Sequence, residues 1–165
     1  MRSFITLTAC LLITNYLTAQ STINYGSLAT FSENGNLQIV VEIPAGTNKK
    51  LEYNYDTNTF PVDIKDGKER IINFLPYPGN YGFIPSTMMD RVRGGDGDAL
   101  DVLVLSQHSA TQTILEVIPI ALLNLIDNGE IDSKIIAVPI NPNHRVISAA
   151  SYSQLHSEYP NVQRL

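Results

Sequence analysis

Three aspartates, Asp96, Asp98 and Asp101, lie within six residues of the chain, directly after two glycines. In extended backbone Asp96 and Asp98 project from the same side about 7 Å apart, and Gly97 between them lets a ligand or another backbone approach closely. Two ionised carboxylates about 4 Å apart repel each other by roughly 4 kcal/mol at an effective dielectric constant near 20. The segment therefore predicts a site that binds cations or takes up protons.

A solvated acidic turn is the alternative interpretation of this segment, since aspartate and glycine form turns readily. A calcium-binding EF-hand loop, in contrast, is excluded by the spacing of its residues. Counting from Asp96, the sixth residue is Asp101 where the loop requires glycine, and the twelfth is Gln107 where it requires glutamate.

A second pair of carboxylates, Asp127 and Asp132, flanks the turn sequence Asn128-Gly129, and Lys134 follows them. Taken alone, this segment also fits an ordinary hairpin loop. Hard carboxylate ligands in two separate loops, with no histidine cluster and no cysteine beside them, favour Mg²⁺ over zinc, with Mn²⁺ as an alternative. Because Mg²⁺ keeps water molecules and binds through substrate phosphates, the two loops together indicate phosphate chemistry.

Phosphate groups need cationic and hydrogen-bonding partners, and five side chains elsewhere in the chain offer them: Lys50, Arg70, Tyr77, Tyr81 and Lys134. Each of these taken singly also fits a solvated surface charge or a core tyrosine. The sequence has no P-loop and no dinucleotide-binding glycine motif, so it does not support a nucleotide cradle. A formal net charge of −5 also argues against a nucleic-acid partner, which would require a basic face.

Short apolar, β-branched segments separated by Gly, Asn, Asp and Pro must position these residues. A length of 165 residues corresponds to one domain. The pattern predicts strands at 37–43, 51–55, 60–64, 70–74, 100–105, 114–125 and 134–138. Many short strands at close spacing indicate a small closed barrel or a sandwich. A helix is predicted only near the C-terminus, at 152–158, with Ser151 as its N-cap.

Residues 1–19 have the composition of a secretory signal peptide, with Arg2 before a long apolar segment that contains no acidic residue. We expect cleavage after Ala19, which leaves Gln20 first, and export of the protein, so that it is periplasmic or secreted. A lipoprotein anchor at Cys10 is the alternative, because residues 7–10 have the residue types of a lipoprotein cleavage box. Without that anchor we expect no membrane attachment of the mature protein.

Four segments in chain order resemble motifs of the soluble, family I inorganic pyrophosphatases. They are residues 42–52 (E-I-P…N-x-K-x-E), Arg70 with 77–85 (Y-x-x-N-Y-G), 96–104 (D-G-D-P-[LIV]-D-V-[LIV]-V) and 127–134 (D-x-x-x-x-D-x-K). Ala99 stands where the third motif usually has proline. Because four separate motifs keep their order along the chain, coincidence does not explain the match.

The resemblance implies a mainly β (α+β) domain over residues 20–165, built as an OB-like five-stranded β-barrel with peripheral strands and helices. It also implies a Mg²⁺-dependent inorganic diphosphatase. Such an enzyme hydrolyses pyrophosphate to two orthophosphates by a multi-metal mechanism with a metal-activated water. Pyrophosphate is then the expected partner, and we also expect a homo-oligomer.

The resemblance further implies roles for individual residues. Asp98 is the expected general base beside the attacking water. The implied metal ligands are Asp96, Asp101 and Asp132, with Asp127 at a substrate-borne metal and Glu42 and Glu52 acting through bound water molecules. The side chains expected to bind the phosphoryl oxygens are Lys50, Arg70, Tyr81 and Lys134, and Tyr77 is expected to support them.

One departure from the family concerns the C-terminus. Family members continue beyond a segment like 151–158 into a helix with an adjacent Tyr-Lys pair that binds phosphate. Here Tyr159 is followed by Pro160, and the sequence stops at Leu165 without such a pair. We therefore expect a C-terminally truncated domain that binds metal but hydrolyses pyrophosphate slowly. Two alternatives stay open: an inactive pyrophosphatase homologue and an extracellular cation-binding module.

Overall fold

The computed structural model describes residues 22–161, so the predicted signal peptide and Cys10 lie outside the described residues. The strands are β1 (Leu37–Ile43), β2 (Ile64–Lys65), β3 (Lys68–Glu69), β4 (Asn80–Phe83), β5 (Asp101–Val104), β6 (Ile114–Leu123), β7 (Ile126–Asp127), β8 (Glu130–Ile131) and β9 (Lys134–Pro139). The helices are α1 (Tyr152–Glu158) and the short 3₁₀ helices η1 (Tyr25–Ser27), η2 (Arg91–Arg93) and η3 (Pro142–His144). None of the helices in this part of the chain is both long and apolar enough to cross a bilayer.

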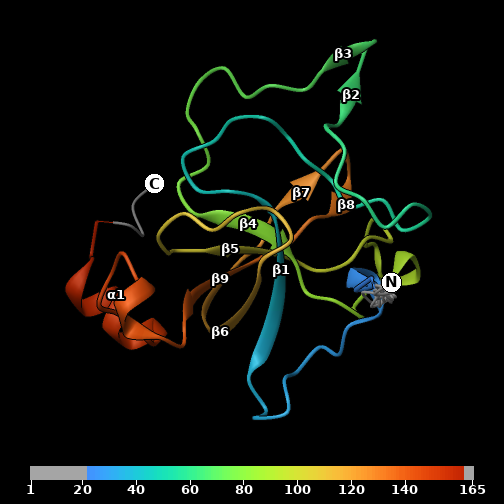
Figure 1. Ribbon diagram of the computed structural model, residues 1–165. Helices are drawn as coiled ribbons and strands as arrows, with labels where there is room; N and C mark the ends of the chain where they lie inside the picture. The colour runs from blue at the N-terminus through green and yellow to red at the C-terminus, as the bar shows by residue number, and fades with distance from the viewer. Residues whose placement is uncertain (1–21, 162–165) are drawn as a thin grey trace, which may run out of the picture.

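Five strands close into a barrel in the order β1-β4-β5-β9-β6, and β6 pairs again with β1. Within the barrel β5 and β9 run parallel, and the other neighbouring pairs are antiparallel. Closure pairs every barrel strand on both sides and so leaves no free sheet edge. In Figure 1 the barrel lies at the centre, with α1 on one flank and the hairpins β2–β3 and β7–β8 above it.

The barrel confirms the mainly β architecture expected from the sequence. The predicted strand 37–43 and the predicted helix 152–158 have the observed bounds. The hydroxyl of Ser151 accepts a hydrogen bond from the backbone N–H of Gln154 at 3.2 Å, which is the predicted N-cap. The strands predicted at 100–105, 114–125 and 134–138 correspond to β5, β6 and β9, with small shifts at their ends.

The prediction of strands at 51–55, 60–64 and 70–74 is largely wrong. These segments form isolated bridges, such as the one between Leu51 and Val62, and contribute one residue to the two-residue strand β2. They lie outside the closed barrel, where they pair with one another only through single bridges and not in a continuous ladder.

The pattern does not predict β4, because its sequence N-Y-G-F contains no β-branched residue. Tertiary contact decides its place instead. A Cβ atom on Gly82 would lie 1.9 Å from the carbonyl oxygen of Val40 on β1, so only glycine permits this close pairing of β4 with β1.

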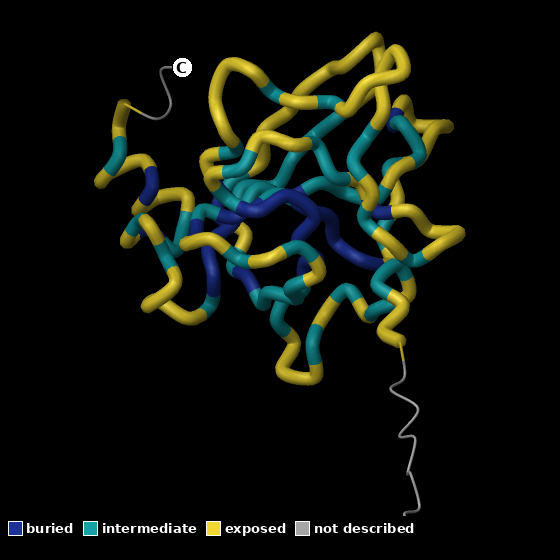
Figure 2. Tube along the Cα trace, turned by 45° about the horizontal axis from the view of Figure 1, so that its top comes forward, coloured by how far each residue is buried: buried dark blue, intermediate teal, exposed yellow. Residues whose placement is uncertain are grey.

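The core has three clusters. One cluster is formed by buried residues from β1, β5, β6 and β9 and by Ile84 directly after β4, namely Ile39, Val41, Ile84, Val102, Val104, Val117 and Ala137. A second lies under α1 and contains Ile120, Val138, Ala149 and Leu155. A third joins Val40 to the aromatic rings of Tyr53 and Phe83, whose centroids are 5.2 Å apart. Figure 2 shows the buried chain passing through the middle of the molecule and the exposed chain in the loops around it.

Asn80 at the start of β4 is fully buried and uses both ends of its amide. Its Oδ1 accepts hydrogen bonds from the backbone N–H groups of Ala45 and Ser109, each at 2.9 Å. Its Nδ2 donates to the hydroxyl of Ser106 at 2.6 Å and to the carbonyl oxygen of Gln107 at 2.7 Å. One side chain thus joins the loops that follow β1 and β5 to β4.

We expect Asn80→Ala to lower the free energy of unfolding by about 2–4 kcal/mol, because it leaves several buried polar groups without partners. Urea denaturation of both proteins measures this difference. The control is Asn143→Ala at an exposed position in η3, which should change stability by less than about 0.5 kcal/mol. Equal stability of Asn80→Ala and the control would contradict the role assigned to Asn80.

Candidate active site

One cleft beside the barrel is lined by every site residue predicted from the sequence. Its two halves share Lys50, Tyr81, Asp96, Asp98 and Asp101. The remaining predicted residues are Glu42 and Glu52 in the first half, and Arg70, Tyr77, Asp127, Asp132 and Lys134 in the second. Barrel closure and the two hairpins therefore bring the four motifs to a single place.

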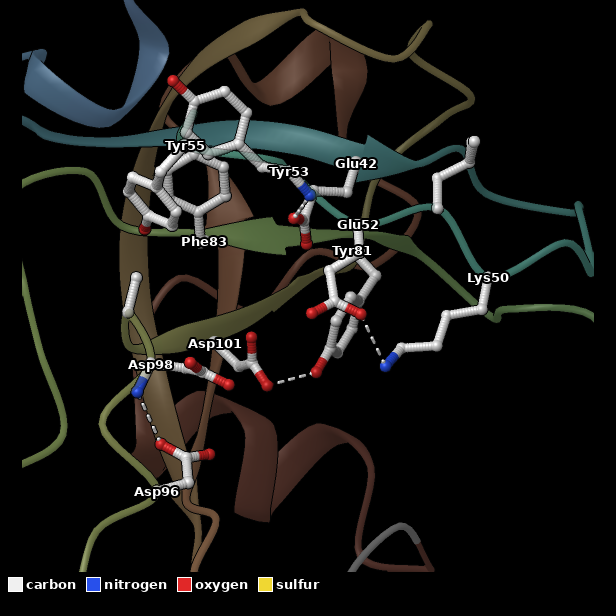
Figure 3. Close-up of a pocket in the computed structure, with 12 residues that line it drawn as sticks. Glu42, Lys50, Glu52, Tyr53, Tyr55, Tyr81, Phe83, Asp96, Asp98 and Asp101 are labelled. Carbon is white, nitrogen blue, oxygen red and sulfur yellow. Dashed lines mark hydrogen bonds and ion pairs between the residues drawn. The ribbon is translucent and has the colours of Figure 1, made fainter. Parts of the chain in front are cut away.

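The first half of the cleft is strongly acidic. It is lined by the carboxylates of Glu42, Glu52, Asp96, Asp98 and Asp101, with the ammonium of Lys50 as its cation. Figure 3 shows the three aspartates gathered on one side of the pocket, with Glu42 across from them on β1.

Glu42 occupies a break in the pairing of β1. The register of β1 against β4 shifts between Val41 and Ile43, and such a bulge re-aims the side chain at its centre. The Glu42 side chain is buried, and its carboxylate accepts a hydrogen bond from the backbone N–H of Tyr53 at 2.7 Å. Burial, reinforced by the charges of Asp101 and Glu52, raises the pKa of Glu42 to about 8.

Asp96 and Asp98 belong to a tight loop before β5. The carboxylate of Asp96 accepts a hydrogen bond from the backbone N–H of Asp98 at 2.9 Å, which holds the loop closed. Gly97 between them has a φ of 89°, a conformation that favours glycine. Partial burial, with the charges of Asp96 and Glu52, raises the pKa of Asp98 above its ordinary value.

Lys134 joins the two acidic loops through ion pairs. Its Nζ lies 2.7 Å from Oδ2 of Asp101 and 2.8 Å from Oδ1 of Asp132. Burial opposes its charge, yet the hydrogen bonds to both aspartates raise the pKa of Lys134. The hydroxyl of Tyr81 donates to the same oxygen of Asp101, and burial together with that carboxylate raises the pKa of Tyr81. Tyr81 therefore stays protonated and acts as a donor.

Sequence reasoning did not identify Asp63, which organises the cations of the second half. Its Oδ2 lies 3.1 Å from Nη1 of Arg70 and 3.6 Å from Nζ of Lys50. Backbone bonds join the same three residues: Lys50 N to Arg70 O, Arg70 N to Asp63 O, and Asp63 N to Lys50 O. Burial opposes the shift, but Arg70 and Lys50 lower the pKa of Asp63.

Other lining residues also escaped the sequence analysis. Tyr53, Tyr55 and Phe83 line the acidic half, and their rings pack together, which no local motif indicates. Asn128 and Glu130 line the second half. Both residues lie within the motif at 127–134, and this position could have identified them as lining residues.

The donor set of the acidic half fits hard divalent cations, because all of its acidic side chains offer oxygen. Among residues 22–161, no three acidic or histidine side chains are already arranged around a single ion. Burial first, and neighbouring carboxylates second, raise the pKa values of Glu42 and Asp98, and a cation bound beside them would favour their ionised forms.

Known proteins are similar to this chain in sequence. Residues 39–163 match the model of a family described as inorganic pyrophosphatase. An inorganic pyrophosphatase of Synechocystis sp. is 36% identical over 106 residues, which are 64% of this chain and 57% of that protein. Another from Saccharolobus solfataricus is 39% identical over 106 residues, or 64% of this chain and 56% of that protein. The chain thus spans little more than half the length of these curated relatives.

Solved structures agree with the sequence comparison. The crystal structure of inorganic pyrophosphatase from Thermus thermophilus superimposes with a TM-score of 0.67 at 30% identity, covering 81% of this chain and 71% of that one. This similarity supports the expected OB-like barrel. Because the family match extends over three quarters of the sequence and includes every residue that lines the cleft, the chain belongs to the inorganic pyrophosphatase family.

Proposed function

We propose that this chain hydrolyses pyrophosphate to two orthophosphates with the help of divalent cations, Mg²⁺ first and Mn²⁺ as a substitute. The observation that carries the proposal is a single cleft in which the carboxylates of both acidic loops lie beside the cations Lys50, Arg70 and Lys134. This combination suits a polyanionic substrate that binds together with divalent cations. Membership in the family supports the same reaction.

The three cations of the cleft would hold the phosphoryl groups. Lys134 and Lys50 are the more enclosed cations, with 19% and 27% of their side-chain surface exposed, whereas Arg70 is 41% exposed. Charge-assisted hydrogen bonds from these groups would orient the substrate and stabilise the charge that develops during hydrolysis. Tyr81 would add a neutral donor, and its ring packs against that of Tyr77 at 5.4 Å.

Asp98 would act as the general base. It lines both halves of the cleft, it is exposed to solvent, and its raised pKa brings it closer to the range useful for a base near neutral pH. Divalent cations held by the neighbouring carboxylates would lower the pKa of a water molecule and neutralise substrate charge. Asp98 would accept the proton that this water loses as it attacks phosphorus.

Export through residues 1–19 and assembly into a homo-oligomer stay proposals from the sequence. N-terminal sequencing of secreted protein and its mass in solution would test them separately from the chemistry of the cleft.

The first test is phosphate release from pyrophosphate by the purified protein, with Mg²⁺, with Mn²⁺ and with chelator. We expect release that depends on the cation, because substrate and carboxylates repel each other without it. A parallel titration measures Mn²⁺ binding without substrate. Cation binding with no phosphate release would contradict the proposal and favour the cation-binding module or the inactive homologue.

Two substitutions separate proton transfer from metal binding. Asp98→Asn should lower turnover by about 100-fold or more while Mn²⁺ affinity stays close to that of the native protein, because the lost group is a proton acceptor. Asp101→Asn should instead weaken Mn²⁺ binding directly. Kinetics and Mn²⁺ titration of both variants measure this difference. The assignment is wrong if Asp98→Asn is the variant that abolishes binding.

The buried carboxyl of Glu42 predicts a pH dependence of stability in metal-free protein. Its folded pKa of about 8 exceeds the ordinary value of 4.5, so the folded state holds the proton longer than the unfolded state. Stability from this group is present below pH 4.5 and is lost as the pH rises through 8. The expected loss is about 1.4 kcal/mol per pH unit between pH 5 and 8.

Glu42→Gln should remove most of this loss, because glutamine keeps an acceptor for the Tyr53 N–H but cannot ionise. Urea denaturation at several pH values in chelator measures it, and the exposed substitution Glu33→Gln is the control. An identical pH dependence in native protein and Glu42→Gln would refute the assignment.

A further inference from the structure

A short segment outside the cleft, residues 89–95, contacts the loop that carries Asp96 and Asp98. The backbone N–H of Met89 donates to the carbonyl oxygen of Asp98 at 2.7 Å, and that of Gly97 donates to Met89 O at 2.9 Å. The two bonds tie the backbone of Met89 to both Gly97 and Asp98. The position of the two carboxylates therefore depends on the position of residues 89–95.

The same segment contacts the second acidic loop through β8. The backbone N–H of Ile131 donates to Gly94 O at 2.7 Å, and Gly95 forms a parallel bridge with Ile131. Ile131 immediately precedes Asp132. Residues 89–95 thus join both acidic loops through backbone bonds.

Residues 89–95 form a closed and tightly packed turn. Asp90 caps η2 by accepting from the N–H of Val92 at 2.9 Å, and its carbonyl oxygen accepts from Gly95 N at 3.0 Å. A Cβ atom on Gly95 would lie 2.7 Å from the backbone carbon of Met89. Because there is no room for even one extra carbon, the turn transmits a displacement from one loop to the other.

We propose that residues 89–95 are a strap that sets the spacing between the two acidic loops and thereby the affinity for divalent cations. This inference rests on the proposed function, since it assumes that both loops bind cations at the same site. Met89 and Gly95 do not line the cleft, so within the described chain they act as positioning residues.

Two substitutions detach the strap at different points. Ile131→Pro removes the N–H that bonds to Gly94. It spares the β7–β8 hairpin, because Ile131 faces Ile126 one step away from the turn, and alternate pairs of an antiparallel ladder exchange no backbone hydrogen bonds. Gly95→Ala forces a carbon against Met89. We expect each to raise the Mn²⁺ dissociation constant about tenfold, the usual effect of removing support behind metal ligands.

Matched variants control for each change. Ile131→Val keeps the N–H and should bind Mn²⁺ like the native protein. Glu69→Pro places proline at the corresponding position of the β2–β3 hairpin, where Glu69 faces Ile64, and should leave Mn²⁺ affinity unchanged. Val92→Ala alters a side chain of the strap that is 95% exposed and should also have no effect. Circular dichroism and thermal melting establish that each variant is folded.

Mn²⁺ titration by electron paramagnetic resonance decides between the outcomes. Weakened binding in both detached variants, with kcat at saturating metal changed less than about threefold, supports the strap. Native affinity in folded Ile131→Pro and Gly95→Ala overturns it, as does equal weakening by Glu69→Pro. If neither detached variant folds, the segment stabilises the whole barrel and the local role is refuted. Absence of Mn²⁺ binding by the native protein would instead count against the proposed function.

Discussion

The parallel pairing of β5 with β9 is the constraint on which the cleft depends. Its register places Asp101 beside Lys134, each at the first residue of its strand. Because parallel strands have their equivalent ends at the same edge, the loops that precede both strands open at one end of the barrel. Those loops carry Asp96, Asp98 and Asp132, so one pairing determines where two distant motifs meet.

The carboxylates gathered at this edge repel one another. The nearby cations offset this repulsion for some of the carboxylates and not for others. Lys134 pairs with Asp101 and Asp132, and Lys50 lies close to Glu52, whereas Glu42 forms no ion pair with any residue of 22–161. Burial raises the pKa of Glu42 to about 8, which favours its neutral form near pH 7. The other carboxylates of the cleft still outnumber its cations, and divalent cations can offset that excess of negative charge.

Residues outside the predicted site hold its frame in place. Asn80 connects three segments through its buried amide, and the carboxylate of Asp63 connects the cations Lys50 and Arg70. Gly82 allows β4 to lie directly against β1. Asn80, Asp63 and Gly82 would not take part in the reaction themselves. Their contacts determine the distances between the groups that would react.

The sequence by itself predicted local features: the strand 37–43, the capped helix at 152–158, the Asn128-Gly129 turn and most of the charged residues that line the cleft. These features depend on residue type and on neighbours within a few positions, or on motifs that a family shares. Only the tertiary structure decided the place of β4, the failure of 51–55 to form a strand, and the contacts of Asp63 and of residues 89–95. Each of these results from contact between segments far apart in the chain, and barrel closure determines which segments meet.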